Sequence, residues 1–290
     1  MTIRDWLRWG VTRFNEAKLF FGHGSDNAFD EVAYLIAHVL GLPLEHLDAF
    51  LDARLTDSEK KQIQKFLERR IEKRIPAAYL TNEAWLGDFR FYVDERVIIP
   101  RSFLAELYPD GLDHFQPDHD AVRSVLDLCT GSGCLAIMLA YAYPKAEITA
   151  ADISTDALAV AQKNIRDYDL AERIDLIHSN LMEKLPEEER YDLIVSNPPY
   201  VTDRDLNSLP REYCHEPRIA LSGGDDGMKI VRYLIKNARK YLHPHGVLVV
   251  EVGYNREFAE DAFPDLPFFW LETHTSTDSV FVLRYEDLPE

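Results

Sequence analysis

The chain has 290 residues, of which 46% are hydrophobic and 28% are charged. This is the composition of a globular protein with room for one large domain and one small one. Its 32 basic and 50 acidic residues give a formal net charge of −18, which disfavours the basic surface that nucleic-acid binding relies on and suits a basic partner protein.

The cysteines and the N-terminal residues indicate a cytoplasmic protein. Cys129, Cys134 and Cys214 are an odd number without metal-ligand spacing, which favours reduced thiols. Residues 1–10 carry charges where a secretory signal needs an apolar stretch, and the mostly apolar run 134–143 is too short to span a bilayer. We therefore expect no membrane span. The ten histidines show no metal-ligand spacing either, so no metal site is expected.

Residues 1 to about 80 have the apolar spacing of helices. One helix is predicted in FDEVAYLIAHVLG (29–41), where Gly41 provides a common stop signal. Its apolar residues recur on one face, which we expect to be buried: Phe29, Val32, Ala33, Ile36, Ala37 and Leu40.

A second helix is predicted after Thr56, because Thr56 and Glu59 have the spacing of a capping box. Pro76 lies beyond its end. The basic cluster 69–74 is expected to be the solvated last turn of this helix, where positive side chains interact favourably with the negative end of the helix dipole. The apolar stripe of this helix consists of Ile63, Phe66, Leu67 and Ile71.

The segment WLGDFRFYVDERVIIPR (85–101) alternates apolar and polar residues around Gly87-Asp88, which indicates a hairpin or an extended linker. From about residue 120 onward, strands and helices alternate. Strands are predicted at 122–128, 146–152, 174–180, 191–197, 247–253, 268–275 and 279–285. Helices are predicted at 134–143, 155–167 and 228–242.

This alternation predicts an α/β fold, with a parallel sheet covered by helices on both faces. The last two strands are separated only by TSTD, so they should pair as an antiparallel hairpin. Seven strands with this ending are typical of the Rossmann-like class I S-adenosylmethionine-dependent methyltransferases.

The first strand of this region leads into LDLCTGSGCLAI (126–137), which has the pattern of a cofactor loop. Gly131 and Gly133 allow a tight turn and a close approach of the backbone to a ligand at the start of a helix. Asp152 ends the next strand 19 residues after Gly133, where a carboxylate can accept both hydroxyls of a ribose.

The loop favours S-adenosylmethionine over a dinucleotide. It lacks the third glycine of the dinucleotide fingerprint, and S-adenosylmethionine has no phosphate to cradle. The third strand ends near Asn180 and Leu181, which we expect at the adenine amine and the adenine ring. The full set of predicted cofactor-binding residues is Asp127, Cys129, Thr130, Gly131, Ser132, Gly133, Asp152, Asn180, Leu181 and Asn197.

The fourth strand ends in SNPPY (196–200), which is the predicted catalytic motif. In a sheet ordered 3-2-1-4-5, this strand end lies beside the cofactor loop. Pro198 and Pro199 cannot donate a hydrogen bond and favour extended conformations at the residues before them. The side-chain oxygen of Asn197 and the carbonyl of Pro198 can therefore both accept hydrogen bonds from one incoming –NH2 group, with Tyr200 laid against its plane.

The motif predicts that the methyl acceptor is a planar nitrogen that carries two hydrogens, but it does not distinguish between groups of this kind. These are a glutamine or asparagine amide, or an exocyclic amine of adenine or cytosine. No metal or covalent nucleophile is required for this transfer.

The motifs LDLCTGSG, AADIS, SNPPY and HEPRIALSGGDDGMKI (215–230) together resemble the bacterial protein-glutamine methyltransferases. The stretch Glu216–Gly227 is more specific to this family than NPPY, which DNA methyltransferases share. The chain departs from many relatives at Cys129, where they have glycine. Gly223–Gly227 lacks the ligand spacing of a calcium loop and is expected to shape one wall of the active site.

The resemblance implies a helical substrate-recognition domain (1–82), a hairpin or extended linker (83–110) and a methyltransferase domain (111–290). It also implies that the NPPY loop grips the glutamine amide and that the substrate is bound by Asn197, Pro198, Tyr200, Arg101 and Glu216.

Two substrates compete within this resemblance. Residues 24–44 and 97–107 look like the enzyme that modifies large-subunit ribosomal protein L-three. The enzyme for the GGQ-motif glutamine of release factors has acid, Thr and Glu in the residues after its Pro-Arg, whereas Arg101 is followed here by Ser102, Phe103 and Leu104. The predicted partner is therefore ribosomal protein L-three, with release factors as the alternative and with no stable nucleic-acid binding.

Overall fold

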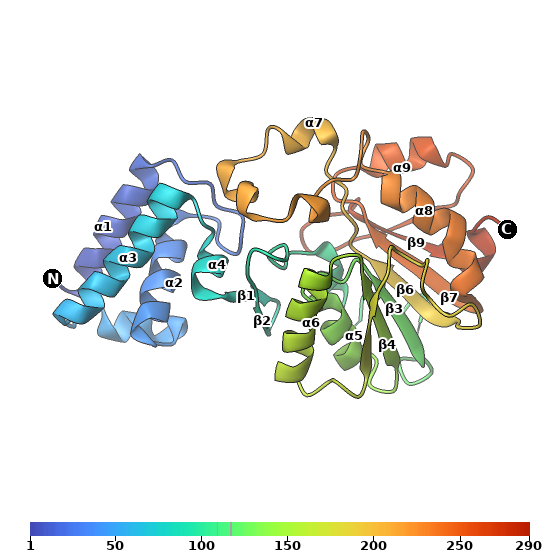
Figure 1. The fold of residues 1–290 in the computed structure, drawn as a ribbon, viewed down its shortest axis with the longest axis horizontal. Coiled ribbons are helices and arrows are strands. Elements are labelled where there is room, and N and C mark those ends of the chain that lie inside the picture. Colours follow the sequence, from blue (N-terminus) through green and yellow to red (C-terminus); the bar gives the residue numbers. More distant parts are fainter. Residues whose placement is uncertain (109, 117) are drawn as a thin grey trace. The chain divides into compact units, whose positions relative to one another are not determined.

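A computed structural model describes residues 1–108, 110–116 and 118–290 (Figure 1). The chain forms two compact units. The helical unit contains Met1–Ala84, Val93–Glu95 and Pro210–His215, and the sheet unit contains Trp85–Tyr92, Arg96–Leu209 and Glu216–Glu290.

Three long helices and one short helix build the helical unit. They are α1 (Ile3–Glu16), α2 (Ala28–Leu40), α3 (Asp57–Lys73) and α4 (Ala77–Thr81), with the 3-10 helix η1 (Leu44–Phe50) after α2. The predicted capping box of Thr56 and Glu59 is confirmed at the start of α3. Gly41 ends α2, as predicted.

The predicted apolar faces are mostly buried. Val32 and Ile36 of α2 pack with Ile63 and Leu67 of α3 in one hydrophobic core. Phe29 is the exception, because its side chain is 55% exposed. That prediction was wrong since helical spacing fixes the direction of a side chain around the axis but does not place a neighbour opposite it.

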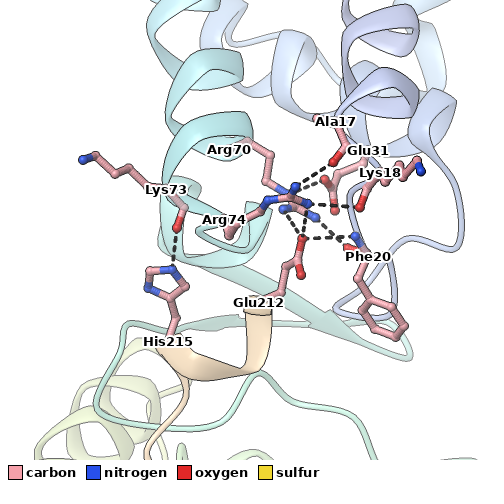
Figure 2. A network of polar contacts seen from close by, with 9 residues as sticks. All are labelled: Ala17, Lys18, Phe20, Glu31, Arg70, Lys73, Arg74, Glu212 and His215. Atoms are coloured by element: carbon pink, nitrogen blue, oxygen red, sulfur yellow. Dashed lines mark hydrogen bonds and ion pairs between the residues drawn. The ribbon is translucent and has the colours of Figure 1, made fainter. Parts of the chain in front are cut away.

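The prediction of a solvated last turn for α3 is wrong at Arg70, which is only 1% exposed. Figure 2 shows its guanidinium among partners from several segments. Arg70 donates to Glu31 Oε1 at 2.7 Å, to Glu212 Oε1 at 3.1 Å and to the carbonyl of Phe20 at 2.7 Å. Both carboxylates are as buried as the arginine, so they offset its buried charge.

Glu212 lies in the 3-10 helix η3 (Arg211–His215), far along the chain from α3. Its Oε1 also accepts from the backbone N–H of Phe20 at 3.1 Å and from Arg74 at 3.4 Å. Arg74 donates further to the carbonyls of Lys18 and Ala17, and the ring of His215 lies 2.8 Å from the carbonyl of Lys73 (Figure 2). The segment 210–215 is thus held in the helical unit by polar contacts.

The sheet unit has a seven-stranded sheet in the order β5-β4-β3-β6-β7-β9-β8. Neighbouring strands from β5 to β7 are parallel, and β9 is antiparallel to both β7 and β8. This confirms the predicted class I methyltransferase topology. The strands are β3 (Ser124–Leu128), β4 (Glu147–Asp152), β5 (Ile174–His178), β6 (Tyr191–Ser196), β7 (Leu242–Glu251), β8 (Phe269–Leu271) and β9 (Val280–Arg284).

Helices lie on both sides of this sheet (Figure 1). The helices α5 (Cys134–Ala142) and α6 (Thr155–Asp167) contact β3, β4 and β5. On the opposite side, α8 (Lys229–Asn237) and α9 (Arg256–Ala262) pack on apolar residues of β3, β6 and β7. This arrangement leaves the carboxyl ends of the parallel strands at one edge, where ligands bind in doubly wound sheets.

The remaining elements are short. The predicted turn at Gly87-Asp88 joins β1 (Glu83–Leu86) and β2 (Phe89–Tyr92), which form a two-stranded sheet. The helix α7 (Asp203–Leu206) follows the fourth parallel strand. The 3-10 helices are η2 (Phe103–Leu107), η4 (Arg218–Ala220), η5 (Ala238–Tyr241) and η6 (Tyr285–Asp287). Within the described ranges, no helix is both long and apolar enough to cross a membrane.

The substitution Arg70→Met should strongly destabilise the helical unit. It keeps much of the side-chain volume but leaves Glu31 and Glu212 as buried carboxylates without Arg70, at a cost of about 3–5 kcal/mol. Thermal and urea unfolding followed by the fluorescence of Trp6 and Trp9, which lie in α1, would measure this loss.

The matched control is Arg69→Met, because Arg69 is the exposed neighbour of Arg70 on the same helix. Its unfolding should change by less than about 0.5 kcal/mol. Equal unfolding midpoints for the two variants would show that the buried cluster does not stabilise this unit.

Candidate active site

The predicted cofactor loop follows β3. Every second residue from 129 to 133 has a left-handed backbone conformation. The φ angles are +62° at Cys129, +55° at Gly131 and +79° at Gly133. Cys129 is the one residue of the three with a side chain, and a left-handed conformation strains it by about 1–2 kcal/mol. Glycine would adopt this left-handed conformation without that strain, so the backbone angle, and not only the size of the side chain, favours glycine at position 129.

Asp152 is tied to this loop by backbone hydrogen bonds. Its carboxylate accepts from the N–H of Gly131 at 2.9 Å and from the N–H of Ser154 at 2.8 Å. Burial raises the pKa of Asp152, while these hydrogen bonds act to lower it. Each carboxylate oxygen retains lone-pair capacity, so the group can still accept hydroxyls of a ribose.

The other predicted loop residues divide by exposure. Asp127, Thr130 and Ser132 are buried, and the Thr130 hydroxyl donates to Asp127 at 2.6 Å. Burial raises the pKa of Asp127 to about 7. These buried side chains therefore support the loop from the protein interior. Partly or fully exposed at the same edge are Cys129, Gly131, Asp152, Asn180, Leu181 and Asn197.

This edge fits a nucleoside-type cofactor. A Cβ built on Gly131 would meet no atom of the described residues nearer than 4.0 Å, so the space over the loop is open. The carboxylate of Asp152 stands beside that space on the adjacent strand. Asn180 donates to Glu183 at 2.7 Å, which leaves its side-chain oxygen outside that hydrogen bond. The direct contacts of these residues with S-adenosylmethionine stay predictions.

The NPPY residues follow β6, which pairs with β3 in the middle of the sheet. Pro198 is buried, whereas Asn197, Pro199 and Tyr200 are partly exposed. The side-chain nitrogen of Asn197 donates weakly to the carbonyl of Arg101 at 3.5 Å. This donation directs the amide nitrogen toward Arg101 and leaves the side-chain oxygen to accept from a ligand.

The glycine-rich stretch after Glu216 packs on the backbone of Tyr200. A Cβ on Gly223 would lie 2.7 Å from Cα of Tyr200, and one on Gly227 would collide with its carbonyl oxygen. Val201 exchanges backbone hydrogen bonds with this stretch, through Leu221 at 2.9 Å and Gly223 at 2.8 Å. The Asn255 side chain donates to the Tyr200 carbonyl at 2.7 Å. The expectation that 223–227 forms a wall beside NPPY agrees with this packing.

Arg101 and Glu216, both predicted to contact substrate, are paired with each other. Arg101 donates to the two carboxylate oxygens of Glu216 at 2.6 and 2.7 Å. Glu216 also accepts from the N–H of Ile99 at 3.0 Å, and its side chain is fully buried. Glu216 therefore orients Arg101, whose side chain is 31% exposed.

Glu251 is a buried acid near this site that the sequence analysis missed. It ends β7 and accepts from Ser102 Oγ at 2.5 Å and from Tyr200 Oη at 3.2 Å. Burial raises its pKa to about 7. The available signal was an acid directly after the apolar run VLVV, at a strand end that faces the same edge as NPPY.

The three cysteines are free, and burial raises the pKa of the Cys129 thiol. Within the described part of the chain, no group of three or more His, Cys, Asp or Glu side chains is arranged to hold a metal ion.

Comparison with known proteins shows the family to which the chain belongs. Residues 5–81 match the PrmC N-terminal domain, and residues 112–212 match the Methyltransferase small domain. The ribosomal protein uL3 glutamine methyltransferase of Neisseria gonorrhoeae is 56% identical, over 99% of this chain and 95% of its own length. The protein of the same name from Burkholderia pseudomallei is 53% identical, over 99% of this chain and 96% of its own.

The chain belongs to the ribosomal protein uL3 glutamine methyltransferase family. The predicted resemblance to protein-glutamine methyltransferases is thereby confirmed, as are a methyltransferase activity and S-adenosylmethionine as methyl donor. Among solved structures, the catalytic domain of hMettl16 in complex with a MAT2A 3′UTR hairpin aligns with a TM-score of 0.51. It covers 89% of this chain and 93% of its own at 16% identity, which supports the fold alone.

Replacing Asp152 with Asn should weaken binding of S-adenosylmethionine. The neutral amide loses charge-assisted acceptance of the ribose hydroxyls, and each such hydrogen bond is worth about 1.5–3 kcal/mol. We expect a Kd about 10- to 100-fold higher by isothermal titration calorimetry. Asp156→Asn is the matched control, because Asp156 is an exposed acid in the first turn of α6. Similar Kd values for both variants would contradict this role of Asp152.

Proposed function

We propose that this protein transfers a methyl group from S-adenosylmethionine to the side-chain amide nitrogen of a glutamine in ribosomal protein uL3. The observation that carries the proposal is the 56% identity to a uL3 glutamine methyltransferase across nearly the full length of both chains. The arrangement of Asn197–Tyr200 supports the same chemistry from the residues themselves.

Asn197 and Pro198 are the proposed acceptors for the substrate amide. When bound, S-adenosylmethionine supplies the methyl group as an electrophile, and breaking its bond between sulfur and the methyl carbon would leave S-adenosylhomocysteine. The Asn197 side-chain oxygen and the Pro198 carbonyl would each accept one N–H of the glutamine amide, which orients the nitrogen. They would also stabilise the positive charge that develops on that nitrogen before it loses a proton, as preorganised dipoles do.

Tyr200 and Arg101 complete the proposed substrate site. The Tyr200 ring would lie against the plane of the glutamine amide. Glu216 holds the Arg101 guanidinium through two hydrogen bonds, which favours a fixed contact with the substrate. Pro199 extends the backbone between these contacts and donates no hydrogen bond.

Substrate recognition is proposed for residues 1–82, which carry the PrmC N-terminal domain match. Residues 83–110 would link this domain to the methyltransferase domain at 111–290. The net charge of −18 favours attraction of a basic ribosomal protein. A ribosomal protein substrate also favours a cytoplasmic location, and the acidic surface disfavours stable nucleic-acid binding.

Release factors are the alternative substrate. The residues after Arg101 disfavour this alternative. Ser102 donates a hydrogen bond to Glu251, and the next two residues are the apolar Phe103 and Leu104. The release-factor enzymes have acid, Thr and Glu in the corresponding stretch. Residues 102–104 include no acidic side chain, which supports uL3 over a release factor as the substrate.

A labelling experiment separates these substrates. The enzyme is incubated with methyl-labelled S-adenosylmethionine and, in separate reactions, with unmethylated uL3 and unmethylated release factor. We expect label in uL3 that survives nuclease treatment, with tandem mass spectrometry locating it on a glutamine side chain. Label in release factor alone would overturn the substrate while leaving the chemistry, and nuclease-sensitive label would overturn both.

The substitution Asn197→Ala should reduce kcat on uL3 by about 10²- to 10³-fold, since one preorganised partner in such a site contributes about 2.7–4 kcal/mol. Binding of S-adenosylmethionine should change far less than kcat. Asn207→Ala is the control, because Asn207 is an exposed asparagine shortly after the motif. Unchanged methyl transfer by the Asn197 variant would refute the proposed role of its side chain.

A further inference from the structure

Glu251 is a buried acid beside NPPY that has no role in the chemistry proposed so far. It is the last residue of β7, and β7 pairs in parallel register with β6, with Ser196 opposite Val250. The strand end that carries Glu251 therefore lies next to the strand end that carries NPPY. The Glu251 residue is only 1% exposed.

Among the described residues, the hydrogen-bond partners of this carboxyl are neutral donors. It accepts from Ser102 Oγ at 2.5 Å, from Tyr200 Oη at 3.2 Å and from the N–H of Leu104 at 3.4 Å. Among the ion pairs of the described residues, none joins Glu251 to a Lys or Arg side chain. Burial raises its pKa to about 7, against the opposing effect of these donors.

A buried acid without a cationic partner lowers stability, so packing alone gives no reason to keep one here. Such costly groups are concentrated at functional sites, where they hold other groups in place. The two side chains held by Glu251 both belong to the site: Tyr200 is in NPPY, and Ser102 directly follows Arg101.

The same strand end also fixes the ring of Tyr200. A Cβ on Gly253 would lie 2.6 Å from Cε2 and 3.0 Å from Cζ of Tyr200, so the ring packs directly on the glycine backbone. Glu251 holds the hydroxyl, Gly253 supports one part of the ring, and Asn255 holds the carbonyl of Tyr200 at 2.7 Å. Three alternate residues, beginning with the last residue of β7, thus restrain one tyrosine.

We propose that Glu251 is a positioning residue for methyl transfer: by accepting from Tyr200 and Ser102, it sets the Tyr200 ring against the substrate amide. This inference rests on the proposed function of NPPY. Glutamine at position 251 would turn an –NH2 donor toward hydroxyl or N–H donors. In Glu251→Gln at least one of the three hydrogen bonds would be lost or would reverse its direction, and the negative charge that draws in the Tyr200 hydroxyl would be absent, so the ring would shift.

The test compares Glu251→Gln with Glu257→Gln, an exposed glutamate in the first turn of α9. Misplacement of a positioning group lowers rate by up to about 10²-fold, so kcat on uL3 should fall roughly 10- to 100-fold in Glu251→Gln, with KM and the Kd of S-adenosylmethionine little changed. Glu257→Gln should match the parent enzyme. Full kcat in Glu251→Gln would overturn the proposal.

A double-mutant cycle with Tyr200→Phe distinguishes positioning from a general structural role. Tyr200→Phe keeps the ring but removes the hydroxyl, and the double variant should be no slower than Tyr200→Phe alone. Independent, multiplying losses would overturn the proposed action through Tyr200. If Glu251→Gln does not fold, Tyr200→Phe decides alone: parental kcat in that variant would show that the hydroxyl contact does not matter.

A measurement without turnover separates this inference from the proposed function. In protein carrying 3-fluorotyrosine at position 200 alone, the fluorine NMR resonance should shift or broaden in Glu251→Gln and stay unchanged in Glu257→Gln. An unchanged resonance in both variants would refute positioning of Tyr200. If the parent enzyme methylates no glutamine, the proposed function fails, while the resonance still reports whether Glu251 holds the ring.

Discussion

The site depends on the close contact between the backbone of Tyr200 and the glycines of the stretch 216–227. Side chains on Gly223 or Gly227 would collide with Tyr200 atoms, so only glycine permits this approach. The contact gives Val201 backbone partners where β6 has ended and Pro198 and Pro199 have no N–H to donate. These contacts fix the backbone directly after NPPY, and the proposed function assigns its acceptors to a substrate that brings its own hydrogens.

Buried acids support the exposed chemistry of the sheet unit. Asp127 holds Thr130 under the cofactor loop, Glu216 holds Arg101, and Glu251 holds Tyr200. Thr130 is itself buried, whereas Arg101 and Tyr200 are partly exposed, and in each case the hydrogen bond to the acid restricts the motion of the side chain. Such preorganisation lowers the reorganisation needed when charge develops on the substrate. The acidic composition of the chain thus contributes to the site as well as to its surface.

Local signals predicted the parts of the structure that short segments determine. The capping box at Thr56, the hairpin turn at Gly87 and the strand that ends at Asp152 depend on neighbours within a few residues. Arg70 and Glu251 could not be predicted in the same way. Their partners Glu212 and Ser102 are more than one hundred residues away, and only the folded chain brings them together.

The central claim is that the acceptors of NPPY direct a methyl group to the amide nitrogen of a uL3 glutamine. Mass spectrometry of uL3 from cells that lack this gene, complemented with the parent enzyme or with Asn197→Ala, tests it most directly. The account predicts a glutamine of uL3 that carries one methyl group with the parent enzyme and none with the variant. Equal methylation of uL3 in the complemented and the deleted cells would contradict it.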